Sequence, residues 1–220
     1  TQEAAAWVQA VVAQCQMRRF TGSEYETLAS TLFELFVKHK KPSSFKSRLI
    51  RALGQVRFEN AKLFKMLNTI LNNSQDVDER SSAYVYFKYS KNNAAFTFLV
   101  ERLSWLQEHG SFLAQLEDDA SDVARCIEYL SMFNLSEFIS QNQVEFEKLK
   151  SLFELALANE TSFFNLDLKP RLSISLLRIL AHFNIVGSSK MLKMALTSEN
   201  YHSRILAIAG SKWIQSNDIT

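Results

Sequence analysis

A chain of 220 residues with 47% hydrophobic and 22% charged residues has the composition of an ordinary folded protein, which excludes an intrinsically disordered chain. Only two prolines and five glycines are present, and this scarcity of helix breakers favours long helices over a turn-rich β fold. The net charge of +2 excludes no class of partner, because it is the sum of two oppositely charged regions.

Hydrophobic periodicity and capping residues predict helices along nearly the whole chain. In chain order the expected helices cover residues 2–18, 23–40, 44–57, 60–72, 78–90, 92–109, 119–134, 143–158, 168–184, 187–197 and 200–216. Ser23 and Glu26 have the spacing of a capping box at the start of the second helix. Further N-caps are expected at Ser43, Asn60, Asn92, Ser121 and Asn200, with Gly110 as a C-cap and Pro170 in a first turn.

The sequence also contains weak internal repeats. The segments "LSMFNL" (130–135) and "LAHFNI" (180–185) share a pattern at a spacing of 50 residues, "LGQVRF" (53–58) is a looser copy, and each closes an expected helix. Arginines near helix starts, at 48, 80, 125, 171 and 204, are 32, 45, 46 and 33 residues apart. These intervals are typical of repeats built from helical hairpins.

The segments "DERSSAYVYF" (78–87), "SDVARCIEYL" (121–130), "KPRLSISLLRIL" (169–180) and "HSRILAIAG" (202–210) make residues 44–214 resemble the HEAT/armadillo class of α-solenoids. The resemblance implies an all-α fold, in which about 11 helices form antiparallel hairpins stacked into a right-handed superhelix. We therefore expect a single helical-repeat domain over residues 1–220. Two shorter pairs of expected helices, "SRLIRALGQVRFENAKLFKMLNTIL" (47–71) and "ISLLRILAHFNIVGSSKMLKMAL" (174–196), are equally similar to the helical-hairpin arrays of organellar RNA-binding proteins.

Sequence motifs for catalysis or cofactor binding are absent, including phosphate-binding glycine loops, HExxH and GxSxG. No histidine has a second ligand at helical spacing, and the acidic run Glu117–Asp122 has the composition of a helix N-terminus. Cys15 and Cys126 lie in apolar runs and are expected to be buried free thiols. We expect no enzyme activity, no metal or other cofactor and no small-molecule substrate.

Location follows from what the first residues lack. They have neither the order of a secretory signal nor an apolar run that spans a bilayer. We expect an intracellular protein, cytoplasmic or nuclear, with an organellar site left open, and no membrane partner. The missing initial Met leads us to expect a fragment of a longer protein.

Charge is the sequence feature that says most about function. Residues 38–65 carry nine cations against the single acid Glu59, a net charge of +8, and residues 101–147 carry ten acids against two arginines, a net charge of −8. The basic region supplies the candidate binding residues, which are Lys38, Lys40, Lys41, Lys46, Arg48, Arg51, Arg57, Lys62 and Lys65.

Two functions are open at this point. One is a non-catalytic scaffold or adaptor, whose helical-repeat surface binds another protein or a peptide segment within a larger complex. The alternative is a helical-repeat protein that binds RNA or another nucleic acid through the basic region.

Overall fold

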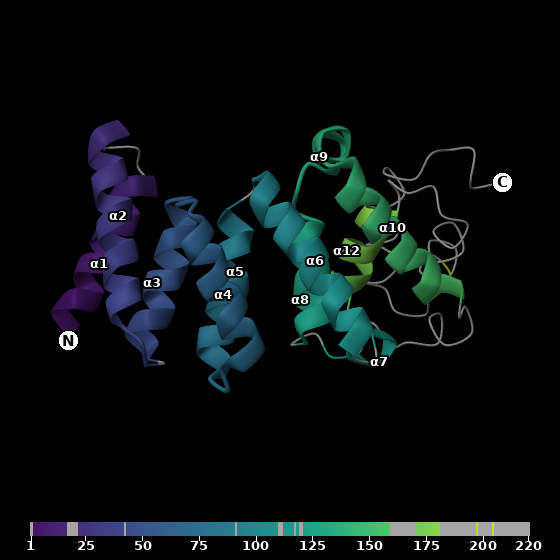
Figure 1. The fold of residues 1–220 in the computed structure, drawn as a ribbon, viewed down its shortest axis with the longest axis horizontal. Helices are drawn as coiled ribbons and strands as arrows, with labels where there is room; N and C mark the ends of the chain where they lie inside the picture. The colour runs from purple at the N-terminus through teal and green to yellow at the C-terminus, as the bar shows by residue number, and fades with distance from the viewer. Residues whose placement is uncertain are drawn as a thin grey trace. The chain divides into compact units, whose positions relative to one another are not determined.

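A computed structural model describes residues 2–16, 22–41, 43–90, 92–109, 112–116, 118, 121–158 and 170–180, and the single positions 197 and 204 (Figure 1). Within these ranges every element is an α-helix and no strand occurs, which confirms the expected all-α class. The helices expected at 187–197 and 200–216 lie outside the described residues apart from positions 197 and 204.

The chain divides into two compact units, Thr1–Ala95 and Phe96–Thr220. The first contains α1 (Gln2–Gln16), α2 (Gly22–Lys38), α3 (Ser44–Gln55), α4 (Ala61–Asn73) and α5 (Val77–Tyr89). The second contains nearly all of α6 (Asn93–His109), then α7 (Phe112–Leu116), α8 (Asp122–Leu130), α9 (Leu135–Gln141), α10 (Gln143–Ala158) and α12 (Pro170–Leu180). The single repeat domain over 1–220 stays a prediction.

Helix α3 is the centre of the first unit, where it contacts α1, α2 and α5. Its side chains Leu49, Ile50 and Leu53 are fully buried. Next to them Gly54 faces the backbone of α5, and a Cβ atom there would lie 2.8 Å from Cα of Tyr86 and 2.9 Å from its carbonyl oxygen. Only glycine therefore lets the two helices approach this closely without a shift of backbone.

Capping side chains begin the helices as the sequence predicts. Ser43 Oγ accepts a hydrogen bond from the backbone amide of Lys46 at 3.1 Å, and Asn60 Oδ1 accepts one from Lys62 at 2.8 Å. Equivalent bonds to Asn92 and Ser121 begin α6 and α8. These N-caps are confirmed, and each is typically worth ~1 kcal/mol. Helix α2 begins at Gly22, so Ser23 lies in its first turn and not at the cap.

The segment "LGQVRF" ends α3 through backbone hydrogen bonds. The amide of Arg57 donates to the Gly54 carbonyl at 2.9 Å, and the amide of Phe58 donates to the Leu53 carbonyl at 3.0 Å. This pair of bonds is a Schellman motif, and Arg57 occupies its left-handed position with φ of 52°. The motif ends α3 at Gln55, two residues before the expected end.

The second unit is built around α8, which contacts α7 and α12 and buries Val123, Ile127 and Leu130. Phe96 of α6 packs against two other phenylalanines, with ring centroids 5.6 Å from those of both Phe133 and Phe138. The short helices α7 and α9 were not among the expected elements. They have 5 and 7 residues, too few for a helical period to stand out in the sequence.

Tyr86 of α5 is fully buried at the contact with α3. Its hydroxyl donates a hydrogen bond to the carbonyl oxygen of Phe58 at 2.5 Å. Burial raises the pKa of the Tyr86 phenol to about 12, because the phenolate would lose its hydration. The folded state therefore keeps this proton at a pH where the unfolded chain releases it.

Alkaline conditions should destabilise the protein through Tyr86. The stabilisation is complete below the unfolded pKa of about 10 and is lost as the pH rises towards 12. Between about pH 9 and pH 11 the free energy of unfolding should fall by ~1 kcal/mol more in the wild type than in Tyr86→Phe, measured by urea denaturation. Parallel pH profiles would show that the phenol is not held protonated by the fold.

Candidate interaction surfaces

Eight of the nine expected binding cations are exposed. Lys38 ends α2, Lys40 and Lys41 lie between α2 and α3, Arg48 and Arg51 lie on α3, Arg57 follows α3, and Lys62 and Lys65 lie on α4. None of these eight forms an ion pair with a carboxylate of the described residues. Their charge is therefore not neutralised by the part of the protein that the structure describes.

Lys46 is the exception, because it is buried. Its Nζ atom lies 2.6 Å from Oε1 of Glu79 on α5, and the two side chains are 8% and 2% exposed. Nζ also donates to the carbonyl oxygen of Lys40 at 3.3 Å, and Ser74 Oγ donates to Oε2 of Glu79 at 2.6 Å. Removing one partner of such a pair leaves a buried charge and typically costs ~3–5 kcal/mol. Lys46 thus stabilises the turn that contains Lys40, and its charge is neutralised by Glu79 inside the unit.

A first cavity, the arginine groove, lies between α1 and α3 and has a volume of about 460 Å3. Arg48 and Arg51 line it from α3, one turn apart, together with the amides of Gln9 and Gln55. The remaining lining residues are Val8, Val12, Ala13 and Ala52. Two guanidinium groups and two carboxamides give the groove an excess of hydrogen-bond donors and a net positive charge.

The Arg51 side chain is fixed by a hydrogen bond to α5. Its Nε atom donates a hydrogen bond to Ser82 Oγ on α5 at 2.8 Å, and that hydroxyl donates to the carbonyl oxygen of Asp78 at 2.7 Å. Ser82 is fully buried, whereas Arg51 as a whole is exposed. The hydrogen bond therefore fixes the orientation of the guanidinium group that lines the groove.

A second cavity, the aromatic groove, has a volume of about 700 Å3 and lies among α1, α2 and the start of α3. It is lined by Ala4, Trp7, Thr31, Leu35, His39 and Phe45. Trp7 is 41% exposed, an unusual degree for the largest apolar side chain. His39 Nδ1 donates to the Leu35 carbonyl at 2.8 Å, and its ring meets Phe45 edge-on, with centroids 4.8 Å apart.

The acidic region belongs to the second unit, and part of its charge is used internally. Arg102 of α6 and Asp122 of α8 form a buried ion pair of 3.0 Å, and the Arg102 guanidinium lies over the Trp105 ring. Glu128 of α8 pairs with Arg171 of α12, which makes this arginine a link between helices. The carboxylates left exposed on α6 and α10 include Glu101, Glu108 and Glu147.

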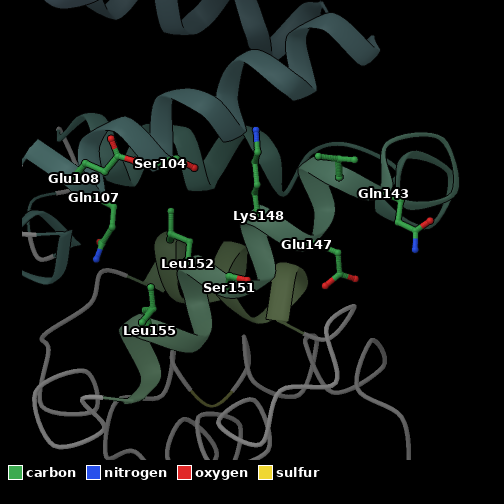
Figure 2. A pocket seen from close by; sticks show the side chains of 10 residues that line it. Ser104, Gln107, Glu108, Gln143, Glu147, Lys148, Ser151, Leu152 and Leu155 are labelled. Atoms are coloured by element: carbon green, nitrogen blue, oxygen red, sulfur yellow. The ribbon is translucent and has the colours of Figure 1, made fainter.

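A groove between α6 and α10 of the second unit has a volume of about 700 Å3 (Figure 2). Lys148 and Leu152 of α10 point towards α6, and Glu108 lies on the facing helix. Val144 and Leu155 lie near the two ends of the part of α10 that lines this groove, and each is 66% exposed. The groove is largely apolar, and its three charged groups do not converge on one point.

Within the described ranges, no three His, Cys, Asp or Glu side chains gather as metal ligands would. Cys126 is buried, as expected. The Cys15 side chain, the Asn200 and Gly110 caps, and His182 and His202 lie outside the described residues. Among the described helices, none is long and apolar enough to cross a membrane.

No family, no curated protein and no solved structure matches this sequence. A function for this chain is therefore inferred from the geometry of its own surfaces.

Sequence reasoning found the exposed cations but missed the aromatic groove. Trp7, Leu35 and Phe45 all stand at helical spacing beside aliphatic residues, which favours a core position for each. The sequence feature that could have indicated this groove is Trp7, because its neighbours Ala4, Ala5 and Ala6 are too small to cover a large ring.

Proposed function

We propose that the chain is a non-catalytic interaction module, whose first unit binds an acidic segment of another protein. The observation that carries this proposal is the arginine groove, in which Arg48 and Arg51 share a cavity and pair with no carboxylate of the described residues. Guanidinium groups bind carboxylates through paired N–H···O bonds. A partner that supplies Asp or Glu side chains would neutralise both charges.

The polar amides of the groove support a peptide ligand. Gln9 and Gln55 offer both N–H donors and carbonyl acceptors, which match the backbone groups of an extended or helical segment. The apolar side chains Val8, Val12 and Ala52 would contact its aliphatic carbons. Specificity would come from this mixed lining, and attraction over distance from the exposed lysines nearby.

Nucleic acid is the second candidate, and the exposed cations from Lys38 to Lys65 are the observation that favours it. Phosphates would bind such cations with little regard to sequence, and affinity would fall steeply with salt. Against it, Arg48 and Arg51 converge on one cavity, which suits a few localised carboxylates better than a continuous phosphate backbone.

Charge reversal in the arginine groove should abolish binding of an acidic peptide. We expect the Arg48→Glu/Arg51→Glu variant to bind a fluorescent Asp- and Glu-rich peptide at least about tenfold more weakly than the wild type, measured by fluorescence anisotropy. The reason is that close, oriented guanidinium groups are replaced by repelling carboxylates.

The matched control is Lys62→Glu/Lys65→Glu on α4, which makes the same change of net charge at exposed positions outside the groove. It should retain the affinity of the wild type within about twofold. Equal losses of peptide affinity in both variants would show that binding depends only on net charge and not on the arginine groove. Tight binding of a single-stranded oligouridylate with no binding of the peptide would establish the nucleic-acid alternative.

We further propose that the helices belong to a HEAT/armadillo-like stack of antiparallel hairpins, in a right-handed superhelix of about 11 helices. Support comes from the first unit, where the alternate helices α1, α3 and α5 contact one another in sequence order while α2 contacts α3 and α4 contacts α5. Each helix thus packs with its nearest neighbours along the chain, as repeat arrays do.

An array of this kind is extended, so its radius of gyration should exceed that of a compact chain. A compact chain of this length is expected at about 17 Å. Small-angle X-ray scattering of the monomer should give a clearly larger value. A value at or below the compact one would count against the superhelical stack.

A further inference from the structure

The aromatic groove points to a more specific partner than an acidic chain. We infer that it binds the apolar anchor residues of an acidic amphipathic segment, so that the partner presents Leu or Phe side chains flanked by carboxylates. This rests on the proposed function, since it names the class of acidic segment that the first unit binds.

Three features show that the groove can hold an apolar side chain. Its lining is apolar except for Thr31 and His39, and its volume of about 700 Å3 lies in the range of ligand-binding cavities. Trp7 contributes a large ring that is 41% exposed and gains favourable burial when covered. Helices α1, α2 and α3 form its three sides, so the site is built on regular elements.

Charge decides what kind of segment would enter. Lys38, Lys40 and Lys41 flank the lining residue His39 in the chain, and all three are exposed without a carboxylate partner in the described ranges. The acids next to lining residues are Glu3 and Glu34, beside Ala4 and Leu35. Positive charge is therefore concentrated next to His39 in the chain, and we place the carboxylates of the partner at the end of the groove formed by His39 and Phe45.

The aromatic groove and the arginine groove lie on different sides of α1. Trp7 lines one and Val12 the other, and at 100° per residue these side chains point about 140° apart around the helix. The buried Val11, which lines neither groove, lies between them. A variant of the aromatic groove therefore leaves the arginines in place, so the two sites can be tested separately.

Single-stranded nucleic acid suits this groove less well. Bases stack on exposed ring faces, whereas the aliphatic Ala4 and Leu35 form part of this concave surface. Of its two large rings, Phe45 is already packed against His39. An inserted side chain fits such a surface better than a stacked base.

The test compares two fluorescent peptides of equal charge. One is an acidic peptide with Leu and Phe one helical turn apart, and in the other both are replaced by Ser. The wild-type chain should bind the anchored peptide at least about tenfold more tightly, because burying two apolar side chains contributes that much. Fluorescence anisotropy gives both affinities.

Two variants locate the effect. Thr31→Gln fills the groove from an exposed helical position without a change of charge, and Trp7→Ala removes the exposed ring. Both should weaken the anchored peptide by about tenfold and leave the Ser peptide within about twofold. The matched control is Thr27→Gln, one turn earlier on α2, exposed and outside the lining, and it should change neither affinity.

The outcomes separate this inference from the proposed function. Equal affinity of the two peptides, or an unchanged affinity in Thr31→Gln, overturns the anchor site while the arginine groove stands. If neither peptide binds, both the anchor site and the proposed binding of an acidic segment are wrong. Binding of an oligouridylate that Thr31→Gln weakens, with no binding of either peptide, assigns the groove to nucleic acid and also overturns the inference.

Discussion

The close approach of α3 to α5 at Gly54 is the constraint on which the first unit depends. At this point a side chain of even one carbon would meet the backbone of Tyr86 at 2.8 Å. Tyr86 is fully buried at this contact, and α3 buries Leu49, Ile50 and Leu53 within the same unit. Burial of large apolar side chains contributes roughly 1.5–3 kcal/mol each, so the buried residues of α3 and α5 stabilise the unit.

The same contact positions the charged groups. With one face of α3 fixed on α5, Arg51 reaches Ser82 of α5 and Lys46 reaches Glu79, while Arg48 remains exposed towards α1. One helix thus carries cations with different roles: a buried lysine that holds the unit together and exposed arginines that line the groove proposed to bind a partner. Desolvation decides between the two roles, because a buried cation needs a fixed counter-ion.

Local features were predictable from the sequence, and distant pairings were not. The caps at Ser43 and Asn60 depend on residues two or three positions away, so their chemistry is visible in the sequence. By contrast, Lys46 is one of nine similar cations until the fold brings it to Glu79, 33 positions further along the chain. The close contact of Gly54 has the same cause, since its partner Tyr86 lies on another helix. Exposed arginines were expected, but the cavity that joins two of them requires α1.

Substitution of Gly54 by Ala tests the contact most directly. In a helix this change alone would raise stability by up to ~1 kcal/mol, whereas forcing a Cβ atom into the Tyr86 backbone should cost ~1–3 kcal/mol or more. Gly22→Ala on α2 is the matched control, because its Cβ atom would meet nothing within 4 Å. We expect urea denaturation to show a lower free energy of unfolding for Gly54→Ala and an unchanged or higher one for Gly22→Ala. A Gly54→Ala chain as stable as the wild type would contradict the close packing of α3 on α5.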